Sequence, residues 1–285
     1  MTKRITAILA AVTLFAASVT VAILVDGSGR STVAQDDAPD FAELTDAFTP
    51  EETAAIIQLI EAYIAANPGF VRDYIMSDPD VIRDAVTELE RRRLEDEASR
   101  QAEAIAENRD LLVSSDLNAV LGNPDGDVTL VEFFDYNCSY CRRALDDMNR
   151  LLDEDPGLRI VLKEFPVLGA GSTEAAQVAA AVNIIAPEAY PRFHRLLLGS
   201  SSQATGEAAI AAAVEAGVEE QLLRITMQTP GAIAHIEEAY QIADALGING
   251  TPTYVLGNEV IVGAVGYDAL RQMIDSVRNC GQTVC

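Results

Sequence analysis

The chain has 285 residues, of which 44 are acidic and 20 are basic, so its formal net charge is −24. Nucleic-acid binding relies on lysine and arginine side chains that neutralise phosphates, so this charge balance argues against a nucleic-acid partner. A hydrophobic fraction of 49% and a charged fraction of 22% are typical of a folded protein and argue against wholesale disorder.

The first predicted element is an export segment. Lys3 and Arg4 precede residues 5–25, a run of 21 residues without charge, glycine or proline. As a helix this run would reach about 31 Å, close to the thickness of bilayer hydrocarbon. It is either an inner-membrane anchor with a tether or a signal peptide cleaved after residues 32–34, and a buried helix of a soluble protein is the remaining alternative. In the first two cases we expect the following residues to be exported to the periplasm or cell envelope, where disulfides persist.

An acidic linker over residues 35–47 separates this segment from a helical region over residues 48–110. The region opens with a capping box, in which Thr49 is the N-cap, Pro50 takes the first helical position and Glu52 completes the motif. The predicted helices cover about 50–66, 70–76 and 80–108.

The apolar stripe of this helical region is too small to form a large core of its own, so we expect it to pack against another copy of the chain or another domain. The second half of the long helix, over residues 90–108, is rich in Glu and Arg. It is either a solvated spacer or part of an oligomerising stalk.

From Asp116 the pattern changes to strands that alternate with helices. The predicted elements are strands over 117–121, 128–134 and 158–165, a helix over 138–152, helices over 172–246, a hairpin of strands over 253–256 and 259–265, and a last helix over 267–278. The second and third strands and the helix between them form a βαβ unit. This order predicts an α/β, thioredoxin-like fold over residues 111–279 with a helical insertion at about 172–246.

Two cysteines, Cys138 and Cys141, form a C-x-x-C motif where the second strand meets its helix. Cys138 falls at the first turn of that helix, where free backbone N–H groups and the helix dipole favour an anion, so we expect its pKa to be low. Cys141 lies on the same helical face but deeper. The pair therefore predicts thiol–disulfide exchange, with Cys138 as nucleophile and Cys141 as resolving thiol, and without a cofactor.

Three other uses of the two thiols are weighed against this prediction. A structural zinc site needs about four ligands, and the two histidines of the chain, His194 and His235, have no companion at ligand spacing. An inert structural disulfide is the second alternative. A two-thiolate Cu(I) site is the third, and it is the basis of an alternative function as a copper-binding or copper-tolerance protein.

Three separated motifs resemble the DsbA-like thiol–disulfide oxidoreductases of bacterial envelopes. They are VEFFDYNCSYC at 131–141, KEFPVLG at 163–169 and GTPT at 250–253, and the resemblance covers about residues 115–279. The helical region is similar to that of the ScsC-type branch (suppressor of copper sensitivity), where it mediates oligomerisation and in some members trimerisation. The resemblance thus implies a possible homo-oligomer through residues 48–110.

The resemblance also implies further site residues. Thr251 and Pro252 would form a cis-proline loop against the active-site disulfide, the alternative being an ordinary trans proline at the start of a strand. Glu132 would be a buried acid that accepts a proton near Cys141, the alternative being a surface carboxylate on an edge strand. The expected partners are exported proteins with thiols or disulfides and a membrane redox partner.

The motifs also bear on whether the protein oxidises, reduces or isomerises disulfides. Ser139 and Tyr140 stand where strong oxidases of the family have Pro-His, and a threonine before the proline is more usual in isomerases. We therefore favour an isomerase or reductase slightly over an oxidase.

Two further cysteines, Cys280 and Cys285, lie in a tail over residues 280–285, outside the family core. The loop between them is flexible enough for a local structural disulfide. A second redox pair that exchanges with the C-x-x-C thiols, or free or intermolecular thiols, are the alternatives.

Overall fold

The computed structural model describes residues 48–285. The predicted export segment at 5–25, the cleavage site at 32–34 and the acidic linker at 35–47 lie outside the described residues. The chain divides between Asp84 and Ala85 into two compact units, which are described in turn.

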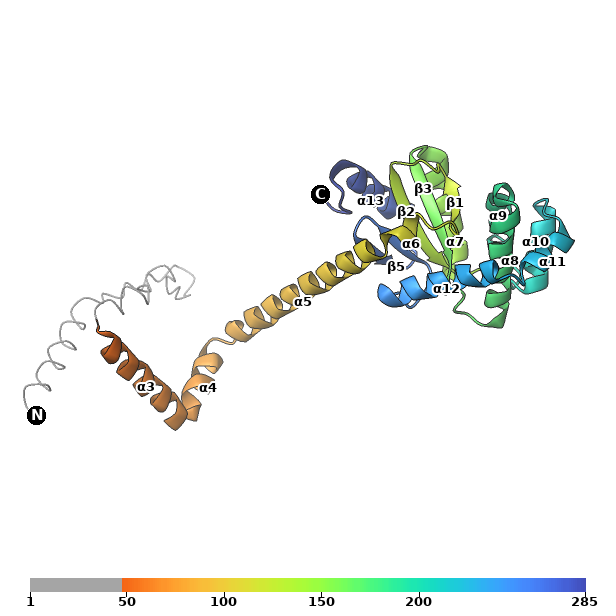
Figure 1. The fold of residues 1–285 in the computed structure, drawn as a ribbon. Helices are drawn as coiled ribbons and strands as arrows, with labels where there is room; N and C mark the ends of the chain where they lie inside the picture. The colour runs from red at the N-terminus through yellow and green to blue at the C-terminus, as the bar shows by residue number, and fades with distance from the viewer. Residues whose placement is uncertain (1–47) are drawn as a thin grey trace, which may run out of the picture. The chain divides into compact units, whose positions relative to one another are not determined.

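The first unit contains helices α3 (Pro50–Ala66) and α4 (Pro68–Ser77) and the start of α5 (Asp80–Glu107) (Figure 1). The predicted capping box is confirmed, since the Thr49 hydroxyl accepts from the Glu52 N–H and the Glu52 carboxylate accepts from the Thr49 N–H at 2.9 Å. Among residues 48–285, no single helix has the length and apolar character of a membrane span. The pair α3 and α4, bent by 84°, meets that test only when both helices are taken together.

The second unit is built on a five-stranded sheet with the order β1-β3-β2-β4-β5. The strands are β1 (Ala119–Gly122), β2 (Val128–Phe134), β3 (Leu158–Glu164), β4 (Thr253–Leu256) and β5 (Glu259–Val262). β2 and β3 are parallel and are joined by α7 (Ser139–Glu154), which confirms the predicted βαβ unit, and the other pairs are antiparallel. The thioredoxin-like α/β fold is thereby confirmed.

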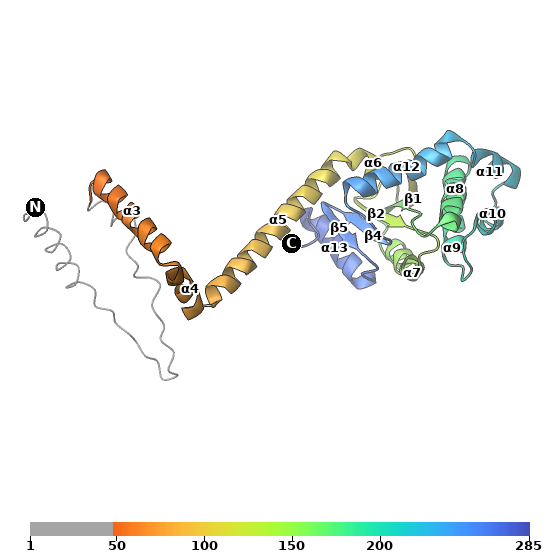
Figure 2. The ribbon, with the colours of Figure 1, turned by 90° about the horizontal axis from the view of Figure 1, so that it is seen from below.

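Helices cover both faces of this sheet (Figure 2). Alternate residues of β2 point to opposite faces, so Leu130 and Phe134 join one buried cluster and Val131 and Phe133 join the other. The first cluster includes residues of α7 and of α13 (Tyr267–Cys280), and the second includes residues of α6 (Arg109–Val113) and α12 (Pro230–Ala245). Because both faces are covered, β2 is buried at nearly every position.

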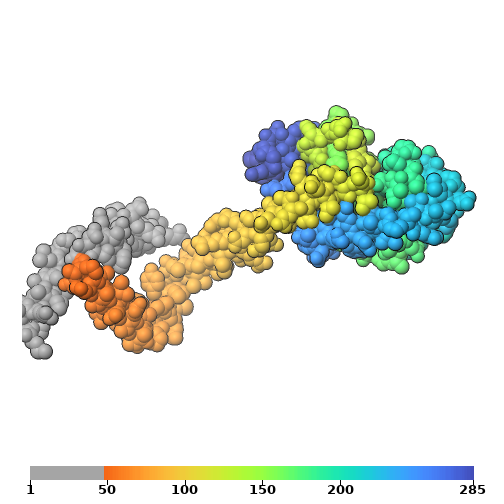
Figure 3. Space-filling view, viewed as in Figure 1, coloured from red at the N-terminus to blue at the C-terminus, as the bar shows by residue number. Residues whose placement is uncertain are grey.

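The insertion between β3 and β4 is helical, as predicted. Its members other than α12 gather at one end of this unit (Figure 3), whereas α12 packs on β3. Besides α12 they are α8 (Ala170–Ile185), a 3-10 turn (Pro187–Ala189), α9 (Tyr190–Leu198), α10 (Gly206–Glu215) and α11 (Glu220–Thr226). Small residues let these helices approach closely, and Ala175 and Ala179 of α8 are fully buried.

The end of α5 belongs to this second unit rather than to a separate helical region. Ile105 and Leu112 are 4% and 2% exposed and pack in the cluster that contains Val131 and Phe133. The Gln101 side chain accepts a hydrogen bond at 3.1 Å from the Val260 N–H on edge strand β5. The compact unit therefore starts earlier than the domain limit predicted after residue 110. The prediction missed these contacts because they lie on a helix whose sequence is mostly polar.

Candidate active site

The C-x-x-C motif lies where β2 gives way to α7. Cys138 is the N-cap of α7, with extended backbone angles, and its sulfur accepts a hydrogen bond at 3.4 Å from the Cys141 N–H. Its own N–H donates to the Asp135 carbonyl at 2.9 Å, which fixes the turn that leads into the helix. The sulfur therefore faces the free N–H groups of the first turn, where a negative charge is stabilised.

The two thiols differ in depth and in acidity. Cys138 is 5% exposed, whereas Cys141 is fully buried, so Cys138 is the outer of the two sulfurs. Hydrogen bonding from Cys141, assisted by Thr251 and the backbone of the first turn, outweighs burial and lowers the pKa of Cys138 to about 5. Burial, the Cys138 sulfur and the Glu132 charge raise the pKa of Cys141 well above that of a free thiol. At neutral pH the site therefore pairs an outer thiolate with an inner thiol.

The predicted proline loop lies against this pair. The Thr251–Pro252 peptide bond is cis, and the Cys138 sulfur lies 3.2 Å from the Thr251 carbonyl oxygen, to which it donates when it is protonated. The Pro252 carbonyl accepts from the Gly263 N–H at 2.9 Å, which holds the loop to the segment after β5. The structure thus brings together residues 113 positions apart in the sequence.

Glu132 is buried in the central strand β2 and is 3% exposed, so it is not a surface carboxylate of an edge strand. Burial, with a smaller effect from the Cys138 charge, raises the pKa of Glu132 to about 8. Its charge in turn raises the pKa of Cys141, so the carboxyl group lies on the side of the buried thiol. A group with this pKa can accept and return a proton near neutral pH.

The loop before Cys138 is held by two residues that the sequence analysis did not single out. Asp135 is 2% exposed, and its carboxylate accepts from the N–H groups of Val167 and Leu168 at 2.9 and 3.0 Å. The Asn137 amide donates to the Ala204 carbonyl at 2.8 Å, and its oxygen accepts from the Ala204 N–H at 2.8 Å. The signal for Asp135 was weak, because its partners lie 32 and 33 residues further on.

The two histidines, which have no companion at metal-ligand spacing in the sequence, are both buried. Burial alone would lower the pKa of His235, but the Glu164 carboxylate that it contacts outweighs this effect and raises it. Burial lowers the pKa of His194 to about 4, and its ring nitrogen lies 3.3 Å from the Tyr136 hydroxyl. Within residues 48–285, no three His, Cys, Asp or Glu side chains form a cluster able to hold a metal ion.

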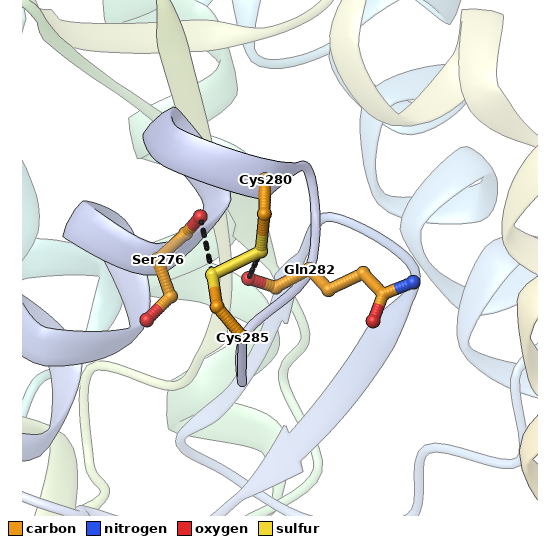
Figure 4. The surroundings of a disulfide bond; sticks show 4 residues. All are labelled: Ser276, Cys280, Gln282 and Cys285. Carbon is orange, nitrogen blue, oxygen red and sulfur yellow. Dashed lines mark hydrogen bonds between the residues drawn. A yellow bond between two sulfur atoms is a disulfide. The ribbon is translucent and has the colours of Figure 1, made fainter.

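The tail cysteines are bonded to each other. Cys280 and Cys285 form a disulfide across a sequence separation of five, and their sulfurs contact the carbonyl groups of Gln282 and Ser276 (Figure 4). Within this loop Thr283 is 2% exposed and donates to the Glu259 carboxylate, which fastens the tail to β5.

The tail disulfide and the C-x-x-C motif lie at opposite ends of β2. Arg278, two residues before Cys280, forms an ion pair with Asp127 at 2.9 Å, just before β2 begins. Cys138 follows the other end of that seven-residue strand, a length of roughly 23 Å. This separation argues against direct exchange between the two pairs of cysteines.

Two protein-family models match the chain. The family model described as "DSBA-like thioredoxin domain" matches residues 129–275, which is more than half of the sequence. The chain belongs to this family. A second model, "Copper resistance protein ScsC N-terminal domain", matches residues 69–95.

Solved structures agree with this assignment. A thioredoxin-like oxidoreductase from Silicibacter pomeroyi DSS-3 is 41% identical, with a TM-score of 0.58, over 61% of this chain and 99% of that chain. The catalytic domain of Proteus mirabilis ScsC is 25% identical, with a TM-score of 0.58, over 62% of this chain and 98% of that chain. These solved structures share the DsbA-like, thioredoxin-like fold of the chain, and the Silicibacter pomeroyi protein is described as an oxidoreductase.

Curated relatives match the chain over only part of their own length. The Na(+)/H(+) antiporter NhaA of Herminiimonas arsenicoxydans is 27% identical over 165 residues, which are 55% of this chain and 25% of that protein. The antiporter NhaA 1 of Salinispora arenicola is 26% identical over 166 residues, again 25% of the protein. The chain thus spans about a quarter of the length of these relatives.

Proposed function

We propose that the protein reduces or isomerises disulfides of exported proteins, with Cys138 as nucleophile and Cys141 as resolving thiol. The observation that carries this proposal is the pair of sulfurs itself: an outer thiol whose pKa is about 5 and a fully buried thiol one helical turn further on. The residues that surround them supply what exchange requires, and no cofactor takes part.

The reaction begins when the Cys138 thiolate attacks one sulfur of a client disulfide. The client disulfide breaks, its other sulfur leaves as a thiolate that takes a proton from solvent, and Cys138 is joined to the client by a mixed disulfide. Glu132 then accepts the proton of Cys141, and the new thiolate attacks the Cys138 sulfur. The client leaves with both its sulfurs reduced, and the two electrons have come from the Cys138–Cys141 dithiol.

Thr251 and Pro252 bring the client backbone to the nucleophile, because the loop that they form contacts the Cys138 sulfur. Large apolar side chains are exposed on neighbouring segments: Tyr140 is 56% and Leu168 55% exposed. Such groups suit unfolded or misfolded client segments, which expose apolar side chains of their own.

The acidity of Cys138 bears on the direction of electron flow. A lower thiol pKa stabilises the reduced site and makes it a stronger oxidant, with thioredoxin near 7 and strongly oxidising DsbA near 3.5. The value of about 5 lies between them. A site of intermediate potential can both break and remake client disulfides, as isomerisation requires.

The helical region forms a homo-oligomer in this proposal. α3 and α4 have no buried residue, and their exposed apolar side chains include Leu59, Ile60, Tyr63 and Phe70, each more than 50% exposed. A second copy would cover this face, and the ScsC N-terminal match over residues 69–95 supports the assignment. Light scattering should show an oligomer that Ile60→Glu dissociates, while Gln58→Glu, which adds the same charge at a polar position, leaves it intact.

We place the enzyme in the periplasm or cell envelope, with a membrane redox partner that sets the oxidation state of its dithiol. The tail disulfide supports this location, because such bonds persist outside the cytosol. Its own role in this proposal is structural, since it closes the loop whose Thr283 side chain fastens the tail to β5.

A second candidate function is Cu(I) binding by the two C-x-x-C thiolates. The observation that favours it is the match to a copper-resistance N-terminal domain, together with two adjacent soft ligands. Anaerobic Cu(I) titration against a chelator tests it, since a protein that cannot outcompete a weak chelator has no sequestering role.

The deciding experiment compares Cys138→Ser with the parent protein in insulin reduction and in refolding of scrambled ribonuclease. We expect both activities to be lost. Cys280→Ser is the matched control, since it changes a cysteine at the far end of the sheet, and it should leave both activities in place. Retention of both activities by Cys138→Ser would refute the assignment of the nucleophile.

A further inference from the structure

A buried tyrosine stands beside the proton acceptor of the site. Tyr254 lies on β4 and is paired directly with Glu132 of β2 in the antiparallel ladder. Side chains of such a pair lie on the same face of the sheet, about 4.5–5.5 Å apart at their Cβ atoms. That face also carries Cys141, which shares a buried cluster with Tyr254.

The hydroxyl group of Tyr254 makes no well-formed hydrogen bond, although it lies close enough to Glu132 to lower the pKa of that carboxyl group. The residue is fully buried, yet its hydroxyl is one of the few buried side-chain atoms among residues 48–285 that make no hydrogen bond. A buried hydroxyl without a partner costs free energy, so a phenylalanine would pack at this position at lower cost. The Glu132 carboxyl group, paired with Tyr254 across the ladder, is an acceptor that would remove this cost when it is ionised.

The charged and titratable groups that face Tyr254 belong to the reaction or adjoin it. They are Glu132 of β2 and, on α7, Cys141, Asp147 and Cys138, and all of them, with burial, raise the pKa of Tyr254. The other elements packed here are apolar: β3 pairs Leu162 with Glu132, β5 pairs Ile261 with Tyr254, and α13 contributes Leu270 and Ile274. Of these groups Glu132 is the one that must alternate between neutral and charged forms.

We propose that Tyr254 is a positioning residue for the resolving step, in which its hydroxyl donates a hydrogen bond to the Glu132 carboxylate once that group is ionised. The inference rests on the proposed role of Glu132 as the acceptor of the Cys141 proton. The Tyr254 hydroxyl keeps its own proton throughout. It stabilises the ionised acceptor before the proton arrives and so increases the fraction of enzyme ready to deprotonate Cys141.

The electrostatics of Glu132 agree with this geometry. Burial and the Cys138 charge raise the pKa of Glu132, whereas the Tyr254 hydroxyl opposes that rise. Removal of the hydroxyl should therefore raise the pKa of Glu132 further. Near pH 7, below the pKa of about 8, each added unit of pKa lowers the ionised fraction about tenfold.

The test is the substitution Tyr254→Phe, followed through the two half-reactions with oxidised glutathione as the probe. Capture of glutathione by Cys138 should be unchanged. Release of glutathione by Cys141 should slow by about tenfold at pH 7, and the pH midpoint of this release should rise by about one unit. Tyr267→Phe is the control, because it removes a phenol of the same buried cluster whose hydroxyl contacts Glu154 instead.

A purely structural role for Tyr254 would leave the pH midpoint of release where it is, and that result would overturn the proposal. A second measurement, the NMR titration of the Glu132 carboxyl in Tyr254→Phe, should show the same upward shift, and an unshifted titration would overturn it equally. Failure of the proposed function is distinguished separately, because Cys138→Ser would then still capture glutathione or reduce insulin.

Discussion

Replacement of Cys141 by Ala should make Cys138 a markedly weaker acid. Hydrogen bonding from the Cys141 side chain is the largest of the effects that lower the pKa of Cys138 to about 5. A hydrogen bond to a charged group contributes roughly 1.5–3 kcal/mol, which corresponds to about one to two pKa units. We therefore expect a pKa of roughly 6–7 in Cys141→Ala, since Thr251 and the helix N-terminus still act on the sulfur.

The choice of assay matters because two effects oppose each other in the exchange rate. Relative to a free thiol of pKa about 8.5, Cys138 at pH 7 is almost fully ionised, a gain of roughly 30-fold in thiolate. The lower basicity of that thiolate reduces its nucleophilicity by a comparable factor, at a Brønsted slope of about 0.4–0.5. A single rate at pH 7 therefore says little, and the pH midpoint is the quantity to measure.

The midpoint can be read from the ultraviolet absorbance of the thiolate and from the pH dependence of alkylation, both in the reduced protein. The parent protein should give a midpoint near 5 and Cys141→Ala a higher one. A parent midpoint near that of free cysteine would refute the claim that the first turn of α7 acidifies this sulfur. An unchanged midpoint in Cys141→Ala would refute the assignment of the acidity to Cys141.

Three further outcomes are expected. The pKa of Glu132 is raised from 4.5 to about 8 in the folded state, so the free energy of unfolding should fall as pH rises through this window, by at most about 5 kcal/mol. Glu132→Gln should lack this fall when unfolding by urea is measured at several pH values. Parallel pH profiles of the two proteins would contradict this. Asp135→Ala leaves the Val167 and Leu168 N–H groups unpaired, so it should lower the free energy of unfolding by about 2–4 kcal/mol and slow disulfide exchange at Cys138. If the stability and the exchange rate are both unchanged, Asp135 does not hold this loop. Cys280→Ser should lower stability by about 2 kcal/mol, the loop-closure value for so short a loop, with insulin reduction retained, and equal stability would show that the tail contributes nothing.

Local signals in the sequence predicted much of the fold. The capping box at Thr49 involves residues three apart, and the strands over 128–134 and 253–256 follow from apolar runs bounded by turn residues. The placement of Cys138 at the start of α7 followed in the same way from a strand that gives way to a helix. Such features depend on residues that are close together in the chain, so the sequence alone is enough to predict them.

Features that depend on long-range pairing could not be predicted. Glu164 and His235 are 71 residues apart, and only the packing of α12 on β3 brings them together. The unpartnered hydroxyl of Tyr254 follows from the register of β2 with β4, which the sequence does not specify. The burial of Ile105 was not predicted because this residue lies in a helix dominated by charged residues, where a single apolar side chain does not produce a helical pattern of apolar positions.

The contact between Gln101 and the edge strand β5 has a practical consequence for isolating the catalytic part. A fragment that starts after residue 110 would lose both the amide that covers the Val260 N–H and the Ile105 side chain. It would present a bare strand edge beside an open apolar patch, the combination that favours strand-to-strand aggregation. A fragment that starts near Ala85 keeps both and should remain dispersed at high concentration.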